Sequence, residues 1–258
     1  MSFQYTQYNK DDRIAWITLN RPEALNALNS GLWCEIHQRL DIADKDESVR
    51  VVVITGTGRA FSAGDDIKEV LTLETASDIR NFFTNCAAPT IAKIIRLAKP
   101  IIACVNGLAF GGGCELAMLC DAVVASENAL FAIPEARVGA YPPIACAIGV
   151  YFTGKLNLSM LALTGEPITA HEAQRIGLVN KVVPGDKLRD ATKELAEKIM
   201  HSAPASIKAI KEALNRKFHP EELEQAVETL IALVENEEGK EGHKAFVEKK
   251  QPKWTATK

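Results

Sequence analysis

The sequence predicts an α/β fold with a helical region at its C-terminal end. Three observations support this: short β-type runs alternate with helical runs up to about residue 185, one central run is apolar at every position, and only helical runs remain from about residue 186. Strands interleaved with helices indicate a layered core with right-handed crossovers. We therefore expect an α/β core over residues 1–185, which holds the predicted chemistry, and a helical region over residues 186–258.

The N-terminal elements read as strand, helix, strand. Residues 13–19 (RIAWITL) and 49–55 (VRVVVIT) are rich in β-branched side chains, which favour strands. Between them, Ser30 is a candidate N-cap for a helix. The apolar side of this helix comprises Leu32, Ile36, Leu40 and Ala43.

The middle of the chain contains a buried strand between two glycine loops. The first loop, GTGRAFSAGDD at 56–66, leads into a helical region that extends to about residue 98 and bends near Pro89. The run IIACV at 101–105 is continuously apolar, which is typical of a strand buried on both faces. The segments after it are the loop NGLAFGGG at 106–113, a helix over about 113–120, and β-type runs at 122–125 and 129–133.

The last part of the chain is predicted to be helical. Three segments place apolar residues at helical spacing: 188–200, 205–217 and 220–237. Amphipathic helices need a surface to cover, so we expect them to pack on the core or on another subunit as an oligomerisation and lid element.

Charge and hydropathy exclude several classes of function. Lys and Arg number 30 and Asp and Glu number 33, so the net charge of −3 provides no general attraction for nucleic acid. The longest uncharged stretches, 100–114 and 138–154, are shorter than the roughly 20 residues that span a bilayer. The N-terminal residues lack a basic and apolar leader. We expect a cytoplasmic protein without a membrane contact.

Common catalytic and metal-binding motifs are absent. The sequence has no GxxxxGK[ST], no GxGxxG between strand and helix, no HExxH and no GxSxG. Its six cysteines form no CxxC pair and its five histidines are scattered singly, so no metal site is predicted.

Two glycine loops and two glutamates are the candidate site. AFSAGDDIK (60–68) and NGLAFGGGCEL (106–116) each place glycines after a strand, where a missing Cβ lets backbone N–H groups approach a ligand. Tight turns would also explain these glycines. Glu115 and Glu135 stand in apolar surroundings, which raise a carboxyl pKa towards neutrality. Taken singly, each glutamate is also consistent with a solvated capping role.

At these residues the sequence resembles the enoyl-CoA hydratase/isomerase (crotonase) superfamily over nearly the whole chain. The similar segments are ITLNRPEALNALN, FSAGDDIKE, KPIIACVNGLAFGGGCELAMLCD, FAIPEARVGAYP, LTGEPITAHEAQRIGLVNKVVP and EGHKAFVEKKQPKW. The resemblance implies the ClpP/crotonase spiral of ββα units, followed by C-terminal helices that join subunits into a homotrimer or homohexamer.

The resemblance also implies roles for these residues. Backbone N–H groups of Asp65 and Gly112 would form an oxyanion hole for the thioester of an acyl-CoA, which is the substrate, so no separate cofactor is implied. Glu115 would activate water and Glu135 would protonate Cα, giving reversible hydration of a trans-2-enoyl-CoA. The residues implied in binding the substrate and CoA are Leu25, Ala63, Asp65, Asp66, Ile67, Lys68, Gly111 and Gly112.

Two departures from the family pattern leave alternatives open. Asp65 stands where typical hydratases have alanine, and Pro143, which has no N–H, stands in a segment where they continue with glycines. A 3,2-enoyl-CoA isomerase, a hydratase for a dienoyl or cyclic acyl-CoA, and a non-enzymatic RNA-binding relative are the alternatives. The charge balance argues against the last of these.

Overall fold

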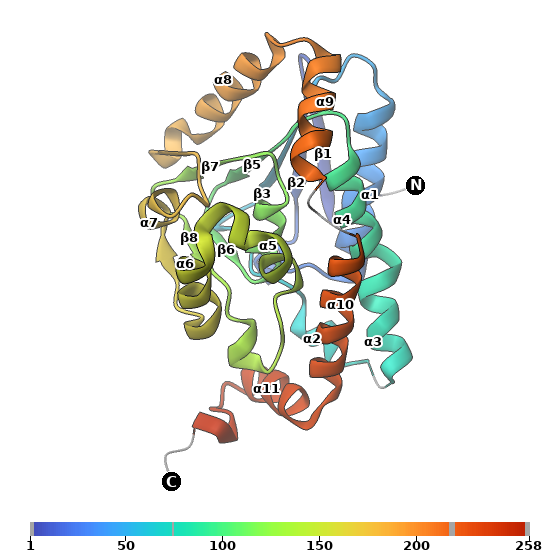
Figure 1. Cartoon of the computed structure of the whole chain (residues 1–258), viewed down its shortest axis with the longest axis vertical. Helices are drawn as coiled ribbons and strands as arrows, with labels where there is room; N and C mark the ends of the chain where they lie inside the picture. The colour runs from blue at the N-terminus through green and yellow to red at the C-terminus, as the bar shows by residue number, and fades with distance from the viewer. Residues whose placement is uncertain (1–2, 74, 217–219, 256–258) are drawn as a thin grey trace.

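The computed structural model describes residues 3–73, 75–216 and 220–255, and these residues form two sheets surrounded by helices (Figure 1). The larger sheet has the order β1-β2-β3-β5-β7-β10, and all its neighbouring strands are parallel except β1 and β2. Its strands are β1 (Thr6–Asp11), β2 (Ile14–Leu19), β3 (Val51–Gly56), β5 (Ile101–Val105), β7 (Ala122–Ser126) and β10 (Lys181–Val183).

The smaller sheet is built from strands that follow those of the larger one. Its order is β4-β6-β8-β9, with β8 and β9 antiparallel. The strands are β4 (Ala60–Ser62), β6 (Leu108–Phe110), β8 (Leu130–Ala132) and β9 (Ile168–Thr169). The pairs β3–β4, β5–β6 and β7–β8 are each followed by helix, so the chain repeats a ββα unit three times. This confirms the predicted crotonase-like α/β fold.

Helices cover both faces of the larger sheet and the ends of the strands (Figure 1). Their bounds are α1 (Ser30–Lys45), α2 (Ile67–Val70), α3 (Ala76–Phe82), α4 (Ala88–Arg96), α5 (Gly112–Met118), α6 (Val150–Thr164), α7 (Ala170–Arg175), α8 (Leu188–Met200), α9 (Pro204–Asn215), α10 (Pro220–Glu235) and α11 (Glu237–Val247). Short 3-10 or π turns are η1 (Pro22–Ala24), η2 (Phe83–Ala87), η3 (Glu135–Val138), η4 (Ala145–Gly149), η5 (Gly185–Lys187) and η6 (Lys253–Thr255).

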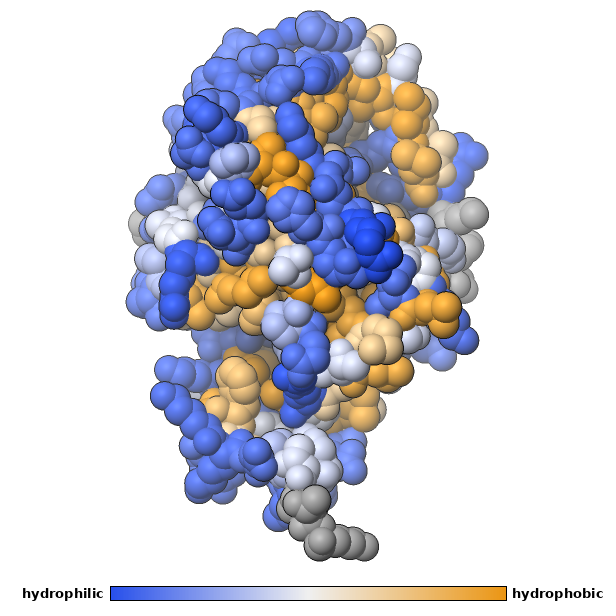
Figure 2. Space-filling view, turned by 90° about the vertical axis from the view of Figure 1, so that its left-hand side faces the viewer, coloured by the Kyte–Doolittle hydropathy of each residue, from blue (hydrophilic) through white to orange (hydrophobic). Residues whose placement is uncertain are grey.

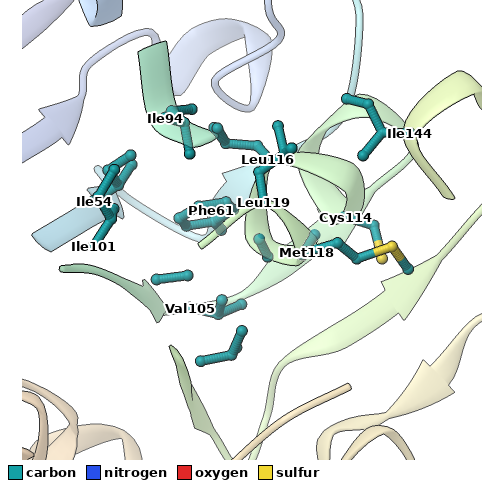
Figure 3. Close-up of a cluster of buried hydrophobic side chains, with 14 of the residues drawn as sticks. Ile54, Phe61, Ile94, Ile101, Val105, Cys114, Leu116, Met118, Leu119 and Ile144 are labelled. Atoms are coloured by element: carbon teal, nitrogen blue, oxygen red, sulfur yellow. The ribbon is translucent and has the colours of Figure 1, made fainter. Parts of the chain in front are cut away.

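The strand β5 is buried on both faces, as its sequence predicts. Ile101 and Val105 belong to the main core beneath α5, where Leu116 and Leu119 pack beside them (Figure 3). Ile102 and Cys104 face the other way, in a second cluster that includes Leu188 and Ala191 of α8. A helix from the C-terminal region therefore covers the face of the sheet opposite the main core.

The structure differs from the local expectations at four points. The N-cap of α1 is Asn29, whose side chain accepts a hydrogen bond from the Leu32 N–H at 2.8 Å, and Ser30 is the first helical residue. The strand β1 was not predicted. The predicted bend is a π turn over Phe83–Ala87, which immediately precedes α4. Pro89 is the second residue of α4. The predicted helix over 205–217 ends at residue 215, and its last position lies outside the described residues.

One helical stretch in the described residues, Ala145–Thr164, is long and apolar enough to span a membrane by length and composition. Its backbone is interrupted at Gly154, which has φ of 70° and ψ of 156°. Only helices that satisfy their own backbone groups cross lipid readily. The stretch also exposes Leu156, Met160 and Leu163. Figure 2 shows that patches of apolar surface lie among hydrophilic residues on one side of the molecule.

An ion pair fastens α9 to the start of β5. Lys211 Nζ lies 2.6 Å from Asp121 Oδ2, and the same oxygen accepts the Ile101 N–H at 2.7 Å. The Lys211 side chain is 6% exposed and that of Asp121 is 26% exposed, so loss of the lysine would leave a largely enclosed carboxylate without its cation.

We predict that Lys211→Ala lowers the free energy of unfolding by about 1–3 kcal/mol, because an unpaired, partly buried charge remains. Urea unfolding followed by circular dichroism measures the change. Lys208→Ala on the same helix removes an exposed lysine and should stay within about 0.5 kcal/mol of the parent. Equal losses for the two variants would contradict the assignment.

Candidate active site

A cavity of about 650 Å³ lies where the glycine loops after β4 and β6 meet. Its lining combines these loops with apolar side chains from several distant segments. Among the lining residues are Leu25, Ala63, Gly64, Asp65, Ile67, Phe83, Gly111, Gly112, Glu115, Pro134, Glu135, Tyr141, Pro143, Leu230, Val234, His243, Phe246 and Lys250.

The loop after β4 is held by backbone hydrogen bonds to the segment around Leu28. The Leu28 N–H donates to Gly64 O at 2.8 Å, and the Asp66 N–H donates to Leu28 O at 3.1 Å. These bonds use the groups on either side of Asp65. The Asp65 N–H has no hydrogen-bond partner among the described residues, and it belongs to a residue that lines the cavity.

The loop after β6 presents a second unused donor. Gly112 is the first residue of α5, so its N–H has no partner within the helix. Gly64 adopts φ of +96°, and a Cβ placed on it would lie 2.9 Å from Phe110 O and 3.3 Å from Gly112 N. Glycine is therefore required for the two loops to touch. The contact brings the free N–H groups of Asp65 and Gly112 to one wall of the cavity.

Both predicted glutamates reach this cavity. Glu115, in the first turn of α5, is 3% exposed, and its Oε1 accepts the Ala145 N–H at 2.8 Å. Glu135 begins η3 directly after β8 and Pro134, and its Oε1 lies 2.9 Å from where a Cβ on Gly111 would be. Its Oε2 is buried without a hydrogen-bond partner among the described residues. The carboxyl group of Glu135 thus lines the cavity with one oxygen that no other described group binds.

Burial dominates the titration of the two glutamates. It raises the pKa of Glu115 well above its usual value, the charge of Glu135 raises it further, and the Ala145 N–H offsets part of the shift. Burial also raises the pKa of Glu135 to about 8, with Asp65 adding to the effect. Two carboxyls in one dry cavity do not both ionise easily, so the pair retains a proton near neutral pH. Such a pair can act as one acid and one base.

These features can bind and protonate an enolate. Two convergent N–H groups stabilise a negatively charged oxygen, and a protonated carboxyl nearby supplies a proton to carbon. A family model described as enoyl-CoA hydratase/isomerase matches residues 9–257. The chain belongs to the enoyl-CoA hydratase/isomerase family.

Similar proteins of this family align along nearly the whole chain. A probable mitochondrial enoyl-CoA hydratase of Dictyostelium discoideum is 38% identical over 252 residues, which cover 95% of this chain and 88% of that protein. The 2,3-dehydroadipyl-CoA hydratase of Escherichia coli (strain K12) is 38% identical over 249 residues, covering 95% and 96%. A crystal structure of carnitinyl-CoA hydratase from Mycobacterium avium has a TM-score of 0.86 at 34% identity, covering 99% of this chain and 100% of that one.

Some of the residues implied in CoA binding line the cavity, and others do not. Those that line it are Leu25, Ala63, Asp65, Ile67, Gly111 and Gly112. Asp66 is instead the N-cap of α2 and forms an ion pair with Arg21 at 2.9 Å. Lys68 is exposed and does not line the cavity. In this member of the enoyl-CoA hydratase/isomerase family, only part of the motif 63–68 therefore lines the cavity.

The departure at Pro143 has a structural counterpart. Pro143 lines the cavity, and the next two residues, Ile144 and Ala145, direct backbone N–H groups to Glu115. This segment therefore still supplies N–H donors, but they hold the carboxyl group of Glu115. Pro143 itself has no N–H to donate, and the N–H groups of the two residues after it fix the orientation of Glu115.

The sequence predicts that the C-terminal helices act as a lid, but none of their residues that line the cavity was predicted. Leu230 and Val234 of α10 and His243 and Phe246 of α11 line the cavity, although they lie beyond residue 185. The apolar spacing of α10 marks a buried face, yet spacing alone does not identify the surface that the face covers. In the structure, the apolar face of α10 packs in one cluster with Phe83 and residues of α3, and the sequence pattern does not indicate this contact.

We predict that Gly113→Ala destabilises the protein by about 1–3 kcal/mol and lowers activity, because the start of α5 must move away from β4. A Cβ on Gly113 would lie 2.4 Å from Ser62 O, a backbone atom that cannot rotate aside. Urea unfolding and steady-state assays measure both effects. The control is Gly185→Ala, whose nearest contact, Ser126 Oγ at 3.3 Å, belongs to a small side chain. An unchanged Gly113→Ala protein would contradict the close contact of the loops.

Proposed function

We propose that the protein is an enoyl-CoA hydratase that adds water reversibly to a trans-2-enoyl-CoA to give a 3-hydroxyacyl-CoA. The observation that carries the proposal is the meeting of two carboxyls, Glu115 and Glu135, with the unpaired N–H groups of Asp65 and Gly112 in one cavity. Relatives named enoyl-CoA hydratase, 37–38% identical over nearly the whole chain, support it.

The N–H groups of Asp65 and Gly112 bind the thioester oxygen in this proposal. As water adds to Cβ, electron density moves to that oxygen and the thioester becomes an enolate. Each fixed donor is worth about 2.7–4 kcal/mol of transition-state stabilisation in comparable sites. The two donors need no reorganisation at that moment, because the bonds around Leu28 already fix the loop that carries Asp65.

The two glutamates handle the protons. For this step the one proton that the pair retains must be on Glu135, so that Glu115 is ionised and accepts a proton from the attacking water. The Ala145 N–H fixes the orientation of Glu115 and favours its ionised form. Glu135, whose Oε2 has no other partner in the described structure, gives its proton to Cα and collapses the enolate. The C–O and C–H bonds form at the expense of the double bond. One proton passes to Glu115 and one leaves Glu135, so a proton must return to Glu135 before the next turnover.

The CoA moiety is proposed to lie along Leu25, Ala63 and Ile67, which line the cavity. The acyl group is proposed to lie against Tyr141 and Pro143, which line the same cavity. The CoA thioester is itself the substrate, and the proposed steps use only side chains and backbone groups of this chain. Cytoplasmic localisation and a trimeric or hexameric assembly remain part of the proposal.

We predict that Glu135→Gln and Glu115→Gln each lower kcat for crotonyl-CoA hydration by about 10²–10⁴-fold, because each removes one proton-transfer group. Loss of the absorbance of the conjugated thioester, with mass identification of the 3-hydroxy product, measures the reaction. Glu127→Gln, at an exposed position after β7, is the matched control and should keep the parent rate. Undiminished activity of Glu135→Gln would overturn the proposal. Double-bond migration and deuterium exchange without a 3-hydroxy product would identify an isomerase instead.

The pH dependence of hydration should also follow Glu135. Its acid form donates the proton, and burial raises its pKa to about 8. We therefore expect kcat/KM to fall as the pH rises through about 8, because the acid form is lost there. A profile of kcat/KM against pH measures this, and a rate that keeps rising well above this pH would contradict the role of Glu135 as the acid.

A further inference from the structure

Asp65 places a third carboxyl group in the cavity, and the proposed reaction uses only its backbone N–H. Its Oδ1 accepts the indole N–H of Trp33 at 3.3 Å. Its Oδ2 has no hydrogen-bond partner among the described residues, and both oxygens of the carboxyl lie close to Gly112: Oδ2 is 3.2 Å and Oδ1 3.3 Å from where a Cβ on that residue would be. The free oxygen of the side chain is therefore next to the residue whose N–H is proposed to bind the thioester oxygen.

The ionisable groups closest to the Asp65 carboxyl are acidic. Asp66 and Glu69 follow it in the chain and raise its pKa, as does burial, which is the larger cause. From the other side of the cavity, Glu115 and Glu135 interact with it unfavourably when charged. The indole of Trp33 is a neutral donor. An ionised Asp65 would therefore share the cavity with carboxyls and with no facing cation.

The basic residues of the cavity wall do not supply this missing charge. Arg137 forms an ion pair with Glu166, and Lys250 forms one with Glu248 at 2.8 Å. His243 is buried, and burial lowers its pKa, which favours the neutral ring. Each of the basic groups that line the cavity in the described structure is therefore engaged elsewhere or uncharged.

We propose that the Asp65 side chain, as a neutral carboxylic acid, helps the two N–H groups to stabilise the enolate, and that its ionised form opposes the same intermediate. This inference rests on the proposed function. With Trp33 donating to Oδ1, the acid proton resides on Oδ2, where it faces Gly112 and can donate towards the negatively charged oxygen. Once that proton is lost, two negative charges lie close together in a cavity of low polarity, where they repel strongly.

The direction of the effect follows from the surroundings. Burial raises the pKa of Asp65 to about 6, so the neutral form prevails below this pH and the ionised form above it. Enolate stabilisation by this residue is therefore present at lower pH and lost as the pH rises through about 6.

The test compares the parent with Asp65→Asn, which keeps an acceptor for Trp33 and cannot ionise. The ratio of kcat/KM, variant over parent, for crotonyl-CoA should rise about 10-fold or more between about pH 5 and about pH 8. Removing the Asp65 charge also lowers the pKa of Glu135, so the variant loses the acid form of Glu135 at a lower pH than the parent does. This effect alone would make the ratio fall at high pH, which is the opposite of the expected rise. Asp186→Asn removes an exposed carboxyl far from the cavity lining and should give a flat ratio. A purely structural role for Asp65 would change the rate without changing its pH dependence.

Binding of acetoacetyl-CoA, a thioester that forms a stable enolate, gives a second readout. The Kd of the parent divided by that of Asp65→Asn should rise with pH, and the ionisation of the ligand cancels in this quotient. Active proteins with flat quotients in both measurements would overturn the role of Asp65 and leave the hydratase proposal standing. If neither protein binds a CoA thioester or hydrates crotonyl-CoA, the hydratase proposal fails and the role of Asp65 fails with it.

Discussion

The contact between the two glycine loops is the constraint on which the candidate site depends. A side chain on Gly64 would collide with Phe110 O, and one on Gly113 would collide with Ser62 O. Because neither collision occurs, β4 and the start of α5 approach closely enough for two unpaired N–H groups to share one wall. The glutamates then need only short segments to reach that wall: Glu115 stands one turn into α5, and Glu135 follows the adjacent strand β8.

The same strands explain why the carboxyls of the site are enclosed. Residues of β5 alternate between the main core and the cluster beneath α8, so the sheet that supports the glycine loops is shielded on both faces. The C-terminal helices α10 and α11 then close the remaining side of the cavity. Low polarity around the carboxyls raises the pKa values of Asp65 and Glu135, so the packing of apolar side chains sets the acid and base properties of the site.

Local patterns predicted the features that depend on neighbouring residues. The apolar run 101–105 predicted a strand that is buried on both faces, and the resemblance placed Glu115 and Glu135 in one site. The polar strand β1 was missed because an edge strand has only one neighbour, and its mixed burial leaves no apolar run. Asn29 and Ser30 are both competent caps, so geometry alone decides between them. Contacts between distant segments, such as α10 on α3, have no local signal.

The cavity wall is assembled from residues that are far apart in the order of synthesis. Leu25 is translated before both glutamates, and Phe246 and Lys250 are translated after them. A nascent chain can form the ββα units before its last helices emerge from the ribosome, but its cavity then lacks one side and admits water. Enclosure of the carboxyls, and with it their raised pKa values, is acquired only when α10 and α11 have been released.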